Sequence, residues 1–171
     1  GPNPDVDGDF DAEVVLHEYV HGLSTRLVGG GVGISSSQAA GMGEGWSDFY
    51  ALALLSEPGD DLDAAYGFGG YVTTQLSVLR ENYYFGIRRY PYSTDLSKNP
   101  LTFKDIDPAQ ISAHPGVPMN PLYTFSPLQA PEVHAQGEVW CAMLWEARAN
   151  LIRKHGFTAG NQLILQLVTD G

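Results

Sequence analysis

Two histidines and a glutamate stand close together in VLHEYVHGL, residues 15–23. On a helix, His17 and His21 lie four residues apart on one face, so both imidazoles can reach a single metal ion. Zinc binds such nitrogens at about 2.0–2.1 Å. Glu18 then falls beside the ion without ligating it, where the general base for a zinc-activated water has to be. The segment predicts a catalytic zinc site, and the alternative is a helix that carries two histidines and no metal.

A catalytic zinc usually takes three protein ligands and leaves one position for water. Glu44, in GMGEGWSDF, follows His21 across a Gly- and Ser-rich loop that can turn the chain back. Asp48 lies on the same helical face as Glu44 and can accept the second ring N–H of a ligating histidine, which fixes its tautomer. Two acids at this spacing weaken a free helix, so their position favours a cation between two helices. The alternative is that both acids are solvated on a helix surface.

Helices are the elements predicted to position these residues. Residues 12–28 form an amphipathic helix, with Asp11 as N-cap and the GGG of residues 29–31 at its end. A second helix follows over residues 39–57 and stops near Pro58. Glycines in its segment AAGMGEG weaken a helix, which indicates close packing of this backbone against another element.

The rest of the chain predicts further helices and one long loop region. Residues 132–156 are the longest helix candidate, and a last helix is expected at about residues 159–168. Residues 61–84 are expected to be helical in part. Eight prolines between residues 90 and 131 exclude long regular elements there. Strand signals are weak throughout, so we expect a mainly α fold with a long Pro-rich loop region.

Composition predicts one compact domain over residues 1–171, since 43% of the residues are hydrophobic and 17% are charged. Nine basic residues against 20 acidic ones give a net charge of −11, which repels phosphate backbones and anionic lipid. The longest apolar run, FYALALL, is far shorter than the roughly 20 residues of a membrane span. We therefore expect neither nucleic acid nor a membrane as partner. Cys141, alone in VWCAMLW, is predicted to be a buried apolar residue.

Four segments resemble the fungalysin family of secreted zinc metalloendopeptidases, which are thermolysin-like gluzincins. These segments are DGDFDAEVVLHEYVHGLSTRLVGG, AGMGEGWSDF, GIRRYPYSTDLSKNPLTFKDI and EVHAQGEVWCAMLWEARANLIRKHGF, and they cover most of residues 7–157. The resemblance implies the helical, C-terminal-type domain of a thermolysin-like zincin in an extracellular setting, with polypeptides as substrates. It makes His17, His21 and Glu44 zinc ligands, Glu18 the general base and acid, and Asp48 the partner of a ligating histidine.

The resemblance also assigns a candidate at the start of the third long helix. His134, in the VH of residues 133–134, matches the histidine that steadies the oxyanion in thermolysin-like enzymes. Such donors contribute roughly 3–4 kcal/mol elsewhere, and the alternative is a helix-start histidine bonded to backbone. Arg88 and Arg89 in GIRRYPY can bind a substrate carbonyl or carboxylate, or form structural ion pairs instead.

Three other features are assigned to structure rather than chemistry. His114 is interpreted as a loop residue and His155 as a charge at a helix C-terminus. DVDGDFD, residues 5–11, is similar to a calcium loop, but its glycine is at the fourth position instead of the sixth. Capping and helix-dipole roles for Asp9 and Asp11 are therefore preferred.

Fungalysin-like enzymes also carry a β-rich N-terminal half, so we expect this chain to be a piece of a longer protein that lacks that half and the propeptide. The predicted function is a zinc metalloendopeptidase. The alternative is a folded zinc-binding fragment with no independent activity, because one wall of the substrate cleft is missing. A structural zinc site is disfavoured because such sites usually close with four protein ligands. An aminopeptidase would need a group that holds a free N-terminus, and the sequence shows no local motif for one.

Overall fold

The computed structural model describes residues 7–73, 82–110, 114–125 and 130–171. Its α-helices, in chain order, are α1 (Ala12–Leu27), α2 (Ser37–Leu55), α3 (Pro121–Phe125), α4 (Val133–His155) and α5 (Phe157–Asp170). Short 3-10 turns form at η1 (Gly8–Phe10), η2 (Val28–Gly31), η3 (Tyr71–Thr73) and η4 (Phe103–Ile106). Strand-like pairing within these ranges is limited to the isolated bridges Tyr66–Tyr92 and Phe68–Gly86. The mainly α fold predicted from the sequence is confirmed.

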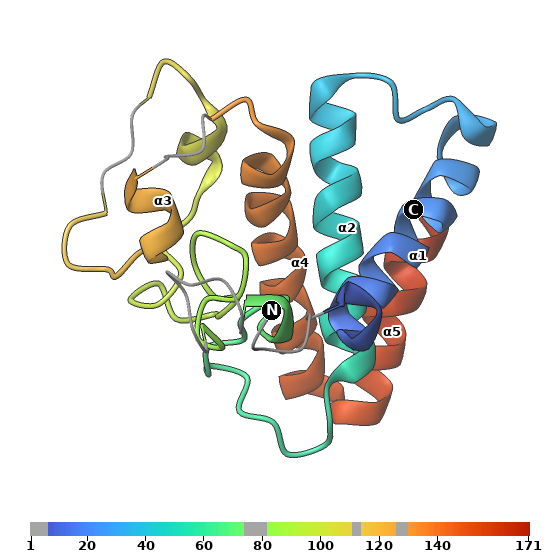
Figure 1. Ribbon diagram of the computed structural model, residues 1–171. Coiled ribbons are helices and arrows are strands. Elements are labelled where there is room, and N and C mark those ends of the chain that lie inside the picture. The colour runs from blue at the N-terminus through green and yellow to red at the C-terminus, as the bar shows by residue number, and fades with distance from the viewer. Residues whose placement is uncertain (1–6, 74–81, 111–113, 126–129) are drawn as a thin grey trace.

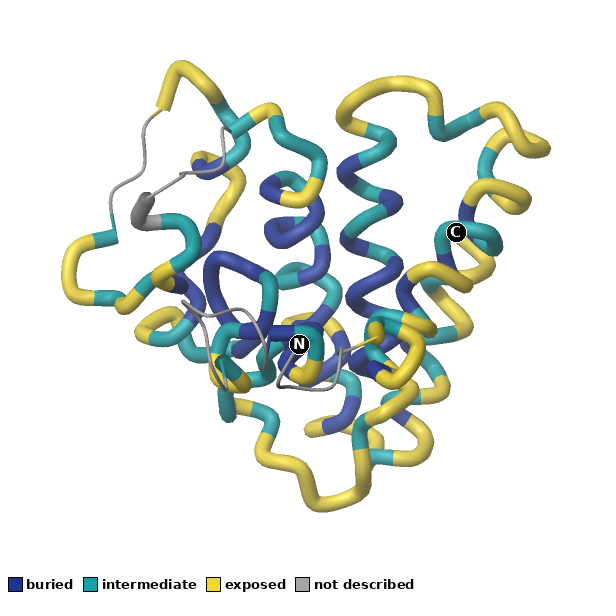
Figure 2. The backbone as a smooth tube through the Cα atoms, viewed as in Figure 1, coloured by how far each residue is buried: buried dark blue, intermediate teal, exposed yellow. Residues whose placement is uncertain are grey.

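Helices α2 and α4 lie side by side at the centre and run in the same direction (Figure 1). Helix α1 packs against α2, while α5 folds back along α4. The long loop region gathers on the other side of α4 (Figure 1). Buried residues run along α2 and α4, whereas α1 buries only His17, Val20 and Ser24 (Figure 2). The face of α1 that meets α2 is thus the one that carries a predicted ligand.

Glycines allow α2 and α4 to approach closely. A methyl group on Gly137 would lie 2.6 Å from Cβ of Glu44 and 2.9 Å from the backbone nitrogen of Gly45. In return, a methyl group on Gly45 would lie 2.6 Å from the carbonyl oxygen of Gly137. No real Cβ tolerates such distances, so the close packing predicted from the glycines of α2 is confirmed. The contact brings Glu44 next to the first turns of α4.

Helix boundaries follow local capping chemistry. Oδ1 of Asp11 accepts hydrogen bonds from the backbone N–H of Glu13 and of Val14, as an N-cap should. Gly156 ends α4 with φ 81°, a left-handed conformation that glycine adopts without strain, and α5 begins directly after it. The helical content expected within residues 61–84 is limited, in its described part, to turn η3. Gly69, at φ 66°, helps turn the chain there, and residues 74–81 lie outside the described ranges.

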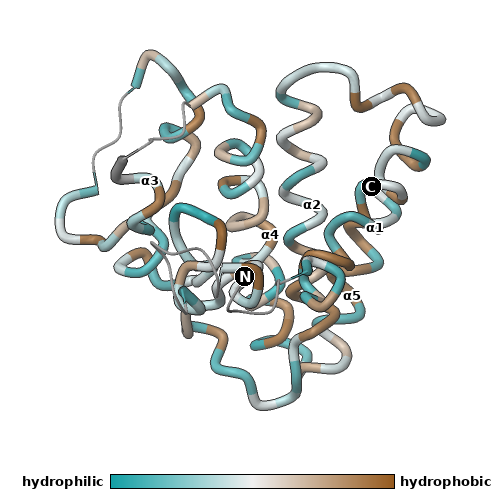
Figure 3. The backbone as a smooth tube through the Cα atoms, viewed as in Figure 1, coloured by the Kyte–Doolittle hydropathy of each residue, from teal (hydrophilic) through white to brown (hydrophobic). Residues whose placement is uncertain are grey.

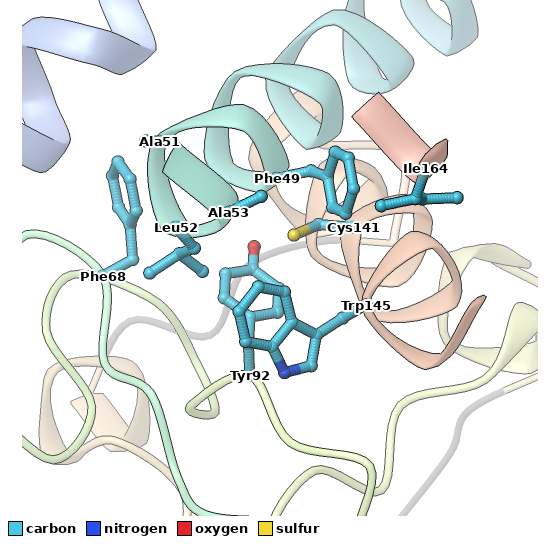
Figure 4. Close-up of a cluster of buried hydrophobic side chains, with 9 residues drawn as sticks. All are labelled: Phe49, Ala51, Leu52, Ala53, Phe68, Tyr92, Cys141, Trp145 and Ile164. Carbon is cyan, nitrogen blue, oxygen red and sulfur yellow. The ribbon is translucent and has the colours of Figure 1, made fainter. Parts of the chain in front are cut away.

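The hydrophobic core fills the space between α2, α4, α5 and the loop region. Figure 4 shows Phe49 and Leu52 from α2 with Cys141 and Trp145 from α4, and Tyr92 entering from the loop. Cys141 is fully buried, as predicted. The loop after α2, rich in Asp and Glu, is mostly hydrophilic in Figure 3. Among the described helices, none combines the length and apolarity that crossing a membrane requires.

Candidate metal centre

Helices α1 and α2 bring the three predicted zinc ligands together. Nε2 of His17 lies 3.0 Å from Nε2 of His21. Glu44 places Oε2 3.2 Å from the first of these nitrogens and Oε1 3.5 Å from the second. One ligand atom from each residue can be chosen so that all lie within 4.8 Å of one another. Residues far apart in the sequence thus converge on one point at the α1–α2 contact.

The donor set fits a zinc ion. Two imidazole nitrogens and one carboxylate oxygen are the ligands of many catalytic zinc sites. Oε2 of Glu44 is buried and makes no hydrogen bond, although Nε2 of His17 and Nε2 of His134 lie 3.2 and 3.5 Å from it. A buried carboxylate oxygen without a hydrogen bond requires an explanation, since such atoms are normally satisfied. A cation between His17, His21 and Glu44 supplies one.

His17 and Glu44 shift each other's pKa in opposite directions. Burial alone lowers the pKa of His17, but the hydrogen bond to Asp48 and the adjacent Glu44 carboxylate outweigh it and raise that pKa to about 9. Burial likewise raises the pKa of Glu44, while contacts with His17 and His21 outweigh it and hold that pKa well below its usual range. The Glu44 carboxylate is therefore ionised at neutral pH and presents a negative charge to the centre.

Asp48 holds the far side of the His17 ring. Its Oδ1 lies 2.7 Å from Nδ1 of His17, and the carboxylate is 1% exposed. If a metal ion displaced the proton of Nε2, a proton kept on Nδ1 and donated to Asp48 would direct the Nε2 lone pair toward His21 and Glu44. The contact supports the predicted partnership with a ligating histidine. Asp48 also accepts from Arg88 and Tyr92, so its charge is neutralised from the loop side.

The two arginines of the loop are buried in ion pairs. Arg88 donates to both oxygens of Asp48 at 2.7 Å. Arg89 donates through Nε to Glu138 at 2.7 Å and through Nη2 to the carbonyl oxygen of Ala135 at 2.8 Å. This geometry favours structural ion pairing for both, and a contact between either arginine and substrate stays a prediction.

The two remaining catalytic candidates lie at the edge of the cluster. Glu18 is exposed on α1, next to His17. His134, in the first turn of α4, has Nε2 3.5 Å from Oε2 of Glu44 and Nδ1 2.5 Å from Oε1 of Glu132. Its neighbour is thus a carboxylate rather than the backbone that the alternative interpretation required. Glu132 also caps α4, because its Oε2 accepts from the N–H of Ala135 at 2.9 Å.

The residues that the sequence assigned to structural roles lie outside the His17–His21–Glu44 cluster. His114 pairs with Asp105 within the loop, at 2.6 Å. His155 is exposed at the end of α4. Asp11 caps α1, while the cap of η1 is Asp7 rather than Asp9. These contacts agree with the capping interpretation of the acidic N-terminal segment over its described residues.

Sequence patterns missed Tyr92, Glu132 and Glu138. Glu132 precedes a helix, where a carboxylate can cap, so a local signal was present for it. Glu138 and Tyr92 carry no such signal. Each becomes important only because folding brings it against a charged group from another element, Arg89 for Glu138 and Asp48 for Tyr92.

Comparisons with known proteins show which family this chain resembles along its whole length. A family model described as fungalysin metallopeptidase (M36) matches residues 1–171. A protein of Aspergillus fumigatus named extracellular metalloproteinase mep is 38% identical over 181 residues, covering 96% of this chain and 24% of that protein. Extracellular metalloproteinase 5 of Arthroderma gypseum is 42% identical over 161 residues, covering 92% of this chain and 21% of that protein. Extracellular metalloproteinase 1 of Trichophyton equinum is 41% identical, with 92% and 22% covered. The chain spans less than a quarter of each relative.

Proposed function

The chain belongs to the fungalysin metallopeptidase family, and from this premise we propose that it forms the zinc-binding helices of an extracellular metalloendopeptidase. The observation that carries the proposal is the convergence of His17, His21 and Glu44 around a buried carboxylate oxygen that makes no hydrogen bond. The relatives' names supply the extracellular setting and the peptidase activity. Polypeptides are the proposed substrates.

Zinc held by His17, His21 and Glu44 would polarise the substrate carbonyl as a Lewis acid and would lower the pKa of a water molecule toward about 7. Glu18, exposed beside His17, takes the proton of the attacking water and returns it to the leaving amine. His134 donates from Nε2 to the oxygen on which negative charge develops. Glu132, beside Nδ1, keeps this ring turned toward Glu44.

The first experiment measures metal content by elemental analysis of the purified 171-residue chain. An unstructured protein substrate is incubated with the same sample, with and without a chelator. About one zinc per chain with chelator-sensitive cleavage is the expected result. A chain that takes up no metal after zinc is supplied would falsify the proposal, because the three ligands would then be only neighbours on two helices.

Two variants separate the proposed roles. Glu18→Gln should keep zinc and lose peptide hydrolysis, because the amide cannot take a proton. Glu44→Ala should lose zinc, because it removes the only carboxylate of the three-ligand set. Glu57→Gln changes an exposed acid after α2 and serves as control. Hydrolysis retained by Glu18→Gln, or zinc retained by Glu44→Ala, overturns the corresponding assignment.

A second candidate is a folded zinc-binding fragment without independent activity. The observation that favours it is coverage, since the chain spans only 21–24% of the relatives' length. A substrate cleft needs two walls, and the described helices provide the wall that carries the ligands. Zinc uptake without cleavage of any unstructured substrate would support this second candidate over the first.

A further inference from the structure

Tyr92 places a hydroxyl group against the carboxylate that supports the metal centre. Its hydroxyl donates to Oδ2 of Asp48 at 2.5 Å, and the side chain is fully buried. Figure 4 shows the ring rising from the loop into the core, with its hydroxyl directed toward α2. Two backbone hydrogen bonds with Tyr66, at 2.8 and 2.9 Å, fix the point from which the ring projects. The position of the hydroxyl is therefore fixed by the backbone pairing with Tyr66 and by the packing of the ring in the core.

The hydroxyl completes the set of donors around Asp48. Oδ1 accepts from His17 and Arg88, and Oδ2 accepts from Arg88 and Tyr92. Each oxygen thus has two donors, and the carboxylate has no freedom to rotate without breaking one of them. Without the Tyr92 hydroxyl, Oδ2 keeps the Nε–H of Arg88 as its one donor among the described residues. The plane of the carboxylate decides where Oδ1 meets Nδ1 of His17.

Tyr92 can act only as a donor in this contact. Burial raises the pKa of its phenol well above the usual value, and the charge of Asp48 raises it further. Both effects favour the protonated phenol. The hydrogen bond to a carboxylate is of the strong, charge-assisted kind.

We propose that Tyr92 is a positioning residue for the metal centre, whose hydroxyl orients Asp48 and, through Asp48, the ring of His17. The proposal rests on the proposed zinc function and adds Tyr92 as a residue that supports Asp48. Groups behind a metal-ligating histidine typically change metal affinity by about 10–100-fold when they are removed. Tyr92 contacts Asp48 and not the histidine itself, so we expect its removal to change metal affinity by the lower end of that range.

The test compares Tyr92→Phe with the unchanged chain. Zinc affinity is measured by competition with a chelator of known strength, and the ring nitrogens of His17 are followed by NMR in the metal-free protein. Tyr92→Phe should bind zinc roughly 10-fold more weakly. It should also shift the Nδ1–H signal of His17 and make that proton exchange faster with water. A purely structural tyrosine would leave the His17 signal unchanged.

Tyr66→Phe is the matched control. Tyr66 forms the same backbone bridge, and its ring packs on Trp145, but its hydroxyl donates to the carbonyl oxygen of Asp61. Removing that hydroxyl should leave zinc affinity and the His17 signal as they are. Equal effects of the two variants would overturn the positioning role, because they would then reflect general loosening of the core.

The outcomes separate this proposal from the proposed function. A chain that binds zinc, with an affinity that Tyr92→Phe does not change, overturns the inference and leaves the zinc function standing. A chain that binds no zinc overturns both. If Tyr92→Phe does not fold, the unchanged chain is used instead: the slowly exchanging hydroxyl proton of Tyr92 should shift when zinc is added. Absence of that shift overturns the inference.

Discussion

Asp48 is a buried carboxylate whose pKa is set by two opposing effects. Burial raises the pKa, and the adjacent Arg88 guanidinium outweighs it and lowers the pKa to about 2. The carboxylate is thus ionised, and the cation that keeps it so is itself only 5% exposed. A buried ion pair contributes little net stability compared with apolar residues, but loss of one partner leaves an uncompensated charge. The pair therefore makes the centre sensitive to changes at Arg88.

Arg88→Met should lower the free energy of unfolding by about 3–5 kcal/mol, because Asp48 stays buried and loses two hydrogen bonds. Urea unfolding in the presence of a chelator measures the change without any contribution from metal. Arg153→Met is the control, since Arg153 pairs with Asp63 at the surface and its loss should change stability far less. Equal losses in the two variants would contradict the claim that burial makes the difference.

His134 touches the metal centre only through Glu44, at 3.5 Å, so its loss should affect catalysis more than binding of the ion. His134→Ala should reduce kcat by roughly 100- to 1000-fold, as removal of an oxyanion donor does in other enzymes. Zinc content by elemental analysis should stay at the level of the unchanged chain. A His134→Ala protein that loses its zinc would instead make this histidine part of the metal site.

At the scale of the elements, the α2–α4 contact sets where Glu44 stands. Gly137→Ala should cost about 1–3 kcal/mol, because its new methyl group meets Glu44 and Gly45 at distances that packed atoms do not adopt. Gly43→Ala is the matched variant, since its nearest neighbours would lie at 3.8–3.9 Å, which is ordinary contact. It should gain up to about 1 kcal/mol from helix propensity. Thermal unfolding of both variants tests whether the two substitutions change stability in opposite directions.

Glu13 links the N-terminal turn of α1 to the loop at residues 67–73, and its Oε2 accepts from the N–H of Gly69 at 2.6 Å. Burial raises its pKa to about 7, with a further contribution from Asp11 and Asp48, while the Gly69 hydrogen bond opposes the rise. The folded protein thus binds this proton more tightly than the unfolded chain does. Between about pH 4.5 and pH 7 the group therefore lowers stability as the pH rises.

Glu13→Gln removes that dependence and keeps an oxygen that can accept from Gly69. At pH 8 the variant should be more stable than the unchanged chain by up to about 3 kcal/mol, and the difference should vanish below about pH 4.5. Urea unfolding across this range, with a chelator present throughout, gives the curve. A constant difference at all pH values would show that Glu13 does not titrate in the range assigned to it.

The sequence predicted those features of the helices that depend on residues close together in the chain. Asp11 and Gly156 cap helices through their own neighbours, so the ends of α1 and α4 were predicted within about a residue. The convergence of His17 and His21 was predicted for the same reason, since helical periodicity puts them on one face, and their role as zinc ligands stays a prediction. Membership of the fungalysin family, expected from four segments, is confirmed.

Contacts between distant residues explain what the sequence could not predict. Tyr92 looks like any aromatic residue of a Pro-rich loop until folding places it against α2. Arg88 and Arg89 are adjacent in the sequence, yet one pairs with α2 and the other with α4. Side-chain direction in an irregular loop has no period that a pattern could detect. The support behind the ligands therefore had to come from the structure.

At the scale of the whole molecule, the proposed zinc ion would link helices α1 and α2 directly. His17 and His21 belong to α1 and Glu44 to α2, and α2 in turn carries the contact with α4. The chain has a net charge of −11, so a bound cation also relieves part of its self-repulsion. An ion that binds the folded chain more tightly than the unfolded one stabilises it by mass action.

Zinc at about 1,000 times its dissociation constant should therefore add about 4 kcal/mol to the free energy of unfolding. For a chain of this size that corresponds to a rise in Tm of roughly 8–16 °C, and a chelator should reverse it. Glu44→Ala should lose most of the rise, because the two histidines alone hold the ion weakly and carry no fixed negative charge. Thermal unfolding of both proteins at several zinc concentrations measures this. If the Glu44→Ala chain gained as much as the unchanged one, zinc would be stabilising the fold from somewhere other than the α1–α2 contact.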